Sequence, residues 1–176
     1  MDYLKRDDIQ QALLFCNSRD KAGDLYKDLQ KKVKSLEFIH GGLDQERRIS
    51  IFNRFRSKQI KFMVATDVAA RGLDFTHVTH VINYDFPFSS QSYTHRTGRT
   101  GRMGREGTAM TFVADRDLGN LKSLLKDNRI EPVWSGSVPN LQQGPAKGGR
   151  RGSGGGGTSR KRRPRRRRGR KPVSGG

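Results

Sequence analysis

The sequence contains little of what extracellular, metal-binding or membrane proteins are built from. Its 176 residues include one cysteine, Cys16, which excludes an internal disulfide framework and cannot form a metal site alone. No apolar run approaches the roughly 18 residues that span a bilayer, and the opening Met-Asp-Tyr-Leu-Lys lacks the apolar core of a signal peptide. We therefore expect a soluble chain of a reducing compartment, the cytoplasm, with no metal site and no membrane partner.

Acidic residues are absent from the end of the chain. Residues 142–176 hold 13 Lys and Arg and no Asp or Glu, which leaves 23 basic and 17 acidic residues for 1–141. Of the formal net charge of +19, the first part carries only +6. The end is rich in Gly, Arg, Lys, Pro and Ser, a composition that cannot form a core. We expect one domain over 1–141 and a disordered basic tail over 142–176.

Short apolar runs without alternation recur along the first 141 residues, and such runs are typical of parallel strands buried on both faces. Helical spacing follows most of them, with Ser18, Asp44 and Asp115 as the expected N-caps. Strands alternating with helices at this spacing predict an α/β fold, with one parallel β-sheet and helices on both of its faces. The predicted strands are residues 12–16, 35–39, 62–65, 78–84 and 108–113.

Polar residues follow these strands at their carboxyl ends, which form the ligand-binding edge of a parallel sheet. There, Thr66 could donate a hydrogen bond to a nucleic-acid phosphate, and Asp74 could accept hydrogen bonds from ribose hydroxyls. The alternative is that Asp67 and Asp74 only cap helices. Asn17, His40 and Asp85 are expected at the same edge.

Two further polar residues, Gln45 and Arg48, share a helix face at i, i+3. They can contact a phosphate backbone, or they can lie on a solvated face.

Residues 95–102, His-Arg-Thr-Gly-Arg-Thr-Gly-Arg, concentrate positive charge beside two glycines. In a helix, His95, Arg99 and Arg102 fall within an arc of about 60°, so these groups need an anion supplied from elsewhere. The glycines remove side-chain bulk that would hold another surface away. Two arginines on a helix at the ligand edge can stabilise a transferring phosphoryl group. A solvated basic helix face is the alternative, and His95 is expected to hydrogen-bond rather than act as a base.

Taken together, these segments resemble the second-lobe motifs of DEAD-box RNA helicases, and they occur in that family's order. The resemblance covers about residues 12–113, and its segments at 66–74 and 95–102 are highly specific. His95 stands where related DEAH-type helicases usually carry Gln. The motifs are LFCNS at 14–18, QERR at 45–48, ATDVAARGLD at 65–74, VINYD at 81–85 and HRTGRTGR at 95–102.

The resemblance implies a RecA-like fold and a role for each matching residue. Arg99 and Arg102 would be arginine fingers on ATP, and His95 would join an interlobe network. Gly72 and Asp74 would meet the ribose region of the nucleotide. The residues on or near the RNA backbone path would be Ser18, Arg19, Gln45, Arg48, Thr66 and Arg71; Ser18 stands where the family usually has Thr and keeps the hydroxyl.

One departure from the family's pattern is an absence. The sequence has no Gly-x-x-x-x-Gly-Lys-Thr loop and no Asp-Glu-Ala-Asp motif, so the residues that cradle a triphosphate and Mg²⁺ are missing. By resemblance, ATP and Mg²⁺ are held mainly by a first RecA-like lobe that normally precedes this one in the same polypeptide. On this hypothesis the chain is the second lobe of an ATP-dependent RNA helicase, inactive as an ATPase by itself.

A second hypothesis is a stand-alone module that binds and anneals RNA through its tail. A first lobe encoded upstream would favour the helicase hypothesis, and a natural start at Met1 would favour the module. The tail also fits a nuclear-import signal or a merely solvated segment, so a nuclear or organellar location is an alternative to the cytoplasm.

The charge of the tail generates a prediction. The basic run at 160–171 should neutralise several RNA phosphates and release their counterions, so the affinity for single-stranded RNA should fall steeply with salt. Deleting residues 142–176 should flatten the slope of log affinity against log salt concentration, measured by fluorescence anisotropy. An unchanged slope would assign the phosphate contacts to the folded domain instead.

Overall fold

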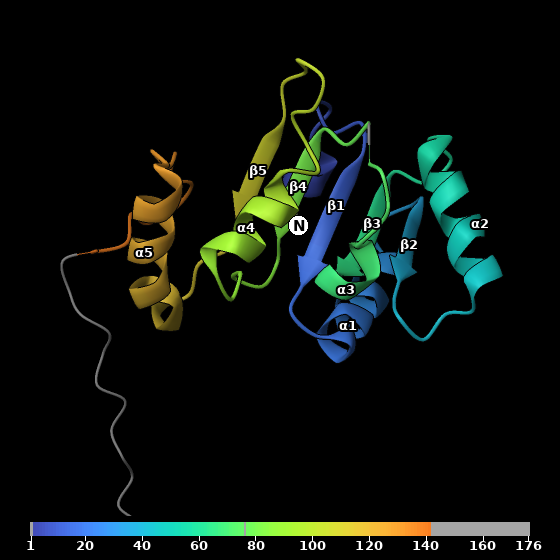
Figure 1. Ribbon diagram of the computed structural model, residues 1–176, viewed down its shortest axis with the longest axis horizontal. Coiled ribbons are helices and arrows are strands. Elements are labelled where there is room, and N and C mark those ends of the chain that lie inside the picture. Colours follow the sequence, from blue (N-terminus) through green and yellow to red (C-terminus); the bar gives the residue numbers. More distant parts are fainter. Residues whose placement is uncertain (1, 76, 142–176) are drawn as a thin grey trace, which may run out of the picture. The chain divides into compact units, whose positions relative to one another are not determined.

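A single five-stranded sheet forms the centre of the domain in the computed structural model, which describes residues 2–75 and 77–141. All neighbouring strands pair in parallel, in the order β2-β3-β1-β4-β5 (Figure 1). The predicted parallel sheet is confirmed, although the fourth and fifth strands are shorter than expected; the predicted tail lies outside the described residues. The strands are β1 (Ala12–Cys16), β2 (Leu36–Ile39), β3 (Phe62–Thr66), β4 (His80–Asn83) and β5 (Thr108–Thr111).

Helices connect the strands, and two of the three expected N-caps are confirmed. The Ser18 hydroxyl accepts a hydrogen bond from the Lys21 amide at 3.3 Å, and the Asp44 carboxylate accepts one from the Arg47 amide at 2.7 Å. Asp115 does not cap a helix; it begins a 3₁₀ turn that precedes the last helix. The helices are η1 (Asp2–Lys5), α1 (Arg19–Gln30), α2 (Gln45–Arg56), α3 (Asp67–Ala70), α4 (Ser90–Thr97), η2 (Asp115–Asp117) and α5 (Leu118–Asn128).

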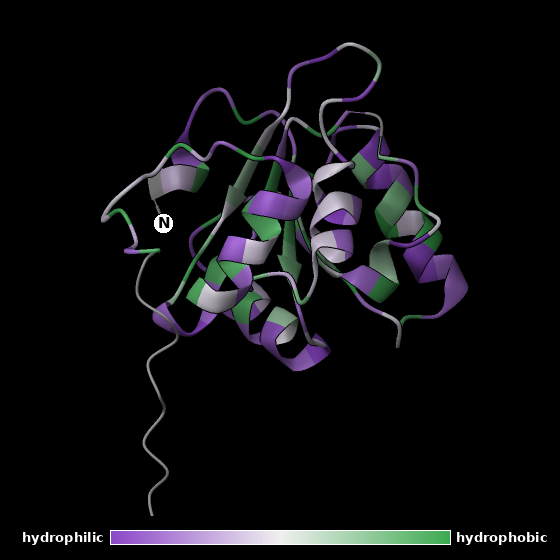
Figure 2. Ribbon diagram, turned by 60° about the vertical axis from the view of Figure 1, so that its left-hand side comes forward, coloured by the Kyte–Doolittle hydropathy of each residue, from purple (hydrophilic) through white to green (hydrophobic). Residues whose placement is uncertain are grey.

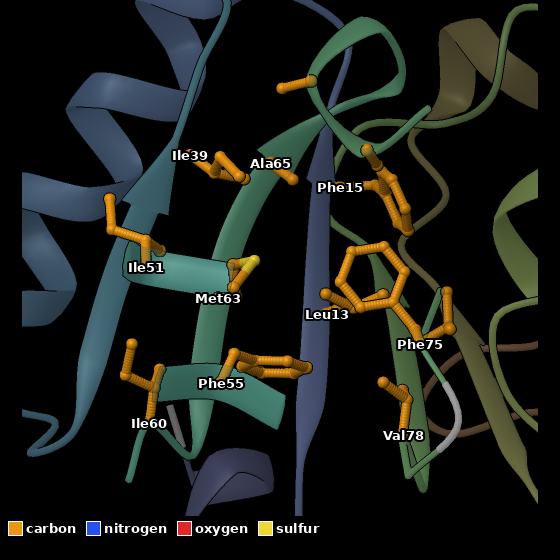
Figure 3. Packing of buried hydrophobic residues seen from close by; sticks show 13 residues of the cluster. Leu13, Phe15, Ile39, Ile51, Phe55, Ile60, Met63, Ala65, Phe75 and Val78 are labelled. Carbon is orange, nitrogen blue, oxygen red and sulfur yellow. The ribbon is translucent and has the colours of Figure 1, made fainter. Parts of the chain in front are cut away.

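Apolar side chains cover both faces of the sheet, as the runs without alternation predict. All five residues of β1 are buried. Leu13 and Phe15 point to the face covered by α2, α3 and the segment after α3, where Phe55 and Phe75 pack edge-to-face with 5.9 Å between ring centres (Figure 3). The intervening β1 residues, such as Leu14, pack against α1 on the opposite face. Helices therefore lie on both faces of the sheet, as expected.

A third cluster joins α4 to α5. Phe86, Leu121 and Leu124 are buried there, with Tyr93 and Trp134 packed against them. Figure 2 shows that the helices carry polar and apolar residues on different sides, as surface helices of a globular domain do. Among the residues that the structure describes, no helix is both long and apolar enough to span a bilayer.

Candidate functional site

Arg96, on α4, is the buried centre of a polar cluster at the carboxyl edge of the sheet. Its side chain is 1 % exposed and meets the Asp67 carboxylate through two parallel hydrogen bonds, of 2.8 Å from Nε and 2.7 Å from Nη2. Nη2 also donates to Asn17 Oδ1 at 2.7 Å. Asp67 begins α3 and Asn17 follows β1, so one guanidinium connects three segments that are distant in the sequence.

The remaining contacts of Arg96 extend the cluster to β4. Nη1 donates to the Asp85 carbonyl at 3.1 Å and to Asn83 Oδ1 at 3.4 Å, and the guanidinium carbon lies 5.3 Å from the centre of the Phe15 ring. Asp67 therefore does not act as a helix cap; Thr66 stands at the N-cap position, and its hydroxyl makes no capping bond. The sequence pattern did not predict a role for Arg96. Three of its partners, Asn17, Asp67 and Asp85, come from the polar residues that follow strands at this edge.

Asp85 is a second charged group of the cluster. Burial by itself would raise the pKa of its carboxyl, but the Asn17 amide and the Lys21 ammonium hydrogen-bond to it at 2.9 Å each, and these contacts hold its pKa below the ordinary value. Burial raises the pKa of the neighbouring Cys16 thiol to about 12, so Cys16 is a buried side chain and no nucleophile.

Arg99 and Arg102 do not lie on a helix, in contrast to the helical reading of residues 95–102. Helix α4 ends at Thr97, with Gly98 as its C-cap, and the chain then runs towards the amino end of β5. The segment 71–79 runs from α3 to the amino end of β4, so the two segments lie side by side. Their contact includes a 2.7 Å hydrogen bond from the Thr100 hydroxyl to the Val78 carbonyl. Arg102 therefore lies away from the carboxyl edge where the pair was expected, whereas Arg99 still borders a cavity beside that edge.

Both arginines are held by oxygen atoms within these two segments. Arg99 donates to the Leu73 carbonyl at 3.0 Å and its guanidinium lies 6.0 Å from the Phe75 ring centre. Arg102 donates to the Gly98 carbonyl at 2.7 Å and pairs with Asp74 at 3.0 Å, where the Asp74 side chain is 69 % exposed. Partial burial and the Arg102 charge lower the pKa of Arg99. Asp74 is thus a partner of Arg102 and not a helix cap.

Two cavities adjoin the arginine pair. Arg99 and Arg102 line one of about 400 Å³, together with His77 and Arg105, whose side chains lie 3.1 Å apart. Arg99 also lines a second cavity, of about 350 Å³, beside His95 and Arg71 near the carboxyl edge. Arg99 therefore borders both openings, beside Arg102 at one and beside His95 at the other, and their cationic groups suit an anionic ligand.

Residues of the predicted RNA path lie on α2 and around α3. Arg48 donates to the Ala69 carbonyl at 3.0 Å and to the Arg71 carbonyl at 3.2 Å, so it joins α2 to the end of α3 and is not a merely solvated side chain. Gln45 is exposed at the start of α2, and the Arg71 side chain is exposed at the C-cap of α3.

The other members of the predicted RNA path follow β1. The Arg19 guanidinium lies against the turn at Gly42, where an added Cβ would come within 2.8 Å of Arg19 Nη1. The Ser18 hydroxyl accepts the capping hydrogen bond at the start of α1. Gly72 has φ +73, in the left-handed region, with open space around it, so this position needs glycine for backbone conformation and not for room.

Metal ligands are not gathered in the described part of the chain: within residues 2–75 and 77–141, no three His, Cys, Asp or Glu side chains come together as a metal site would require. What the site offers is guanidinium groups, hydroxyls and backbone amides, which recognise phosphate.

Comparison with known sequences finds one family and many relatives. Residues 1–104 match the model of the helicase conserved C-terminal domain. The DEAD-box ATP-dependent RNA helicase CshA of Geobacillus kaustophilus is 46% identical over 110 residues, which are 62% of this chain and 24% of that protein. The chain spans about a quarter of the length of the curated relatives that it matches.

Solved structures agree with the sequence comparison. The C-terminal domain of the DEAD-box protein Dbp5 is 32% identical, with a TM-score of 0.68 over 74% of this chain and 77% of that one. Saccharomyces cerevisiae Dbp5 bound to RNA and ADP BeF3 is 34% identical, with a TM-score of 0.63 over 67% of this chain and 32% of that one.

The buried cluster predicts unequal effects for two arginine substitutions. R96M leaves the Asp67 carboxylate without its cation and should lower the free energy of unfolding by about 3–5 kcal/mol. R102M removes an exposed ion pair with Asp74 and should lower the free energy of unfolding by only about 0–1 kcal/mol. Urea unfolding followed by circular dichroism measures both. Equal effects would show that Arg96 is not the group that holds these segments together.

Proposed function

Because this chain belongs to the helicase conserved C-terminal domain family, as a second RecA-like lobe of the DEAD-box type, we propose that it supplies half of the ATPase site and part of the RNA path of an ATP-dependent RNA helicase. The observation that carries the proposal is the contact between segments 71–79 and 98–107. Through this contact Arg102 pairs with Asp74 and Arg99 bonds to the Leu73 carbonyl, and both arginines line one opening.

The arginine pair acts as arginine fingers in this proposal. When bound, ATP supplies the phosphoryl group, and Mg²⁺ neutralises part of the phosphate charge. ATP and Mg²⁺ are both held mainly by the first lobe. The Arg99 guanidinium is bonded to a neutral carbonyl, and the exposed Arg102–Asp74 ion pair costs only about 0–1 kcal/mol to break. Both guanidinium groups can therefore turn to phosphate oxygens when the lobes close. Asp74 then becomes available for ribose hydroxyls, and Gly72 allows the turn beside it.

RNA binds along the carboxyl edge in this proposal. Thr66 keeps a hydroxyl that no cap bond uses, Arg71 is exposed, and Arg48 fixes the end of α3. Arg19, Ser18 and Gln45 lie along the same route, at the starts of α1 and α2. These groups recognise the phosphate backbone and carry no base readout, which suits binding that is independent of RNA sequence.

The RNA path and the arginine pair share a mechanical connection. Asp67 lies on α3 between Thr66 and Arg71, and it is bound to Arg96, three residues before Arg99. RNA binding at α3 therefore orders the same element that holds α4 in place. His95, exposed in the last turn of α4, is positioned to contact the first lobe when the cleft closes.

The proposal predicts no RNA-stimulated ATP hydrolysis by this chain alone, and restored hydrolysis when it is joined in one polypeptide to the first lobe of a DEAD-box helicase such as CshA. In the joined protein, R99A/R102A should lower kcat by about 10³-fold or more, because both transition-state cations are lost. R116A, which removes an arginine that is 78% exposed and paired with its neighbour Asp117, is the control and should leave kcat unchanged. Undiminished turnover by R99A/R102A would refute the arginine-finger role.

A further inference from the structure

A cavity of about 600 Å³ opens at the amino ends of β2 and β3, and none of its lining residues lines the two cavities beside the arginine pair. Its floor is apolar and comes from three segments: Leu4 of η1, Val33 after α1, and Phe62 of β3. This volume is within the range of ordinary ligand pockets.

Lysines form the rim of this cavity. Lys32, Lys34 and Lys61 line it, together with Lys5. Among the described residues, Lys32, Lys34 and Lys61 form no ion pair, whereas Lys21, Arg54 and Arg96 each have a carboxylate partner. Like charges gathered around one opening repel one another, and an anionic ligand relieves that repulsion.

Backbone hydrogen bonds fix the walls of the cavity. The Ser35 carbonyl accepts from the Lys61 amide at 2.9 Å and from the Phe62 amide at 3.0 Å, so the loop after α1 is tied to the start of β3. Ser35 has φ 55, an uncommon left-handed conformation for a residue with a side chain, and the two bonds hold it there. The Val33 amide is bound to the Leu29 carbonyl at 2.8 Å. The opening is therefore built into the fold before any ligand arrives.

The side chains that line this cavity fit one class of ligand better than another. The Phe62 side chain is buried, and the Lys61 ammonium lies 5.4 Å from its ring centre, so no free aromatic face is offered for stacking a nucleobase. An apolar floor bordered by several lysines instead matches an apolar side chain flanked by carboxylates. We propose that this cavity is a docking site for an acidic peptide segment of a partner protein, with an apolar residue anchored between Val33 and Leu4.

The site is independent of the proposed helicase role. A partner bound there leaves Arg99, Arg102 and the exposed residues of α3 uncovered, so it can bring the lobe to a location or a complex without blocking ATP or RNA.

The test uses the full chain and a fluorescein-labelled peptide, Asp-Glu-Leu-Asp-Glu-Leu-Asp-Glu, measured by anisotropy. K32E/K34E should weaken binding at least about tenfold. K122E/K126E changes two exposed lysines of α5, so it alters the net charge equally and leaves any contribution of the tail unchanged; it should stay within about twofold of the unaltered chain.

Two further probes separate the possible ligands. A peptide with both leucines replaced by serine should bind the unaltered chain and K32E/K34E about equally, and so should an eight-nucleotide uridine RNA. The proposal is overturned if K32E/K34E and K122E/K126E lose affinity for the leucine peptide to the same extent. It is also overturned if K32E/K34E weakens binding of the serine peptide, or of the RNA, as much as it weakens binding of the leucine peptide.

Folding of the variants is checked by thermal unfolding. If K32E/K34E fails to fold, amide chemical shifts of the unaltered chain decide the question: on addition of the leucine peptide, Val33, Ser35 and Phe62 should shift, and shifts confined to other residues would contradict the proposal.

Discussion

The ion pair between buried Arg96 and partly buried Asp67 is the constraint on which the rest of this lobe depends. A charged group that is 1 % exposed is stable only when its donors are satisfied. Arg96 meets that condition with oxygens of four residues from three segments: Asn17, Asp67, Asn83 and Asp85. A buried pair of this kind adds little net stability over an apolar core, but it tolerates only one placement of its partners. Arg96 therefore fixes where α4 and α3 lie on the sheet.

The arginines that follow are held in a different way. Arg99 and Arg102 are bonded to backbone carbonyls and to one exposed carboxylate, contacts that a phosphate can replace at small cost. Arg96 is therefore buried and fully bonded, whereas Arg99 and Arg102 are partly exposed and bonded mainly to backbone oxygens. In the proposed function, the anion that the two arginines meet is the triphosphate of an ATP held mainly by a first lobe.

The sheet could be predicted from sequence because its central strands β1 and β3 are short, buried apolar runs followed by polar residues. The caps at Ser18 and Asp44 followed from their position before helical spacing. The end of α4 was missed because periodicity was extended through Gly98, where the helix in fact stops. Asp115 failed as a cap because one 3₁₀ turn precedes α5, and spacing does not reveal such a turn.

The role of Arg96 could not be predicted from residues 95–102, because a run of basic residues does not indicate which of its side chains is buried. A usable signal lay elsewhere: Asn17, Asp67 and Asp85 all follow strands at one edge, and the partly buried Asp67 carboxylate needs a cation. Helix α3, with four residues, is too short to show a period, so the link between α3 and α4 became visible only in three dimensions. The roles of the arginine pair and of the RNA-path residues still rest on resemblance and stay predictions.

The central claim is that Arg96 is a buried, permanently bonded hub, and the exchange rate of its Nε proton tests this most directly. In a nitrogen-15 labelled sample, the Arg96 Nε–H should exchange with solvent about 100-fold or more slowly than the Arg102 Nε–H, because exchange at Arg96 requires the cluster to open. Equal exchange rates at Arg96 and Arg102 would show that the cluster opens freely and would contradict the account.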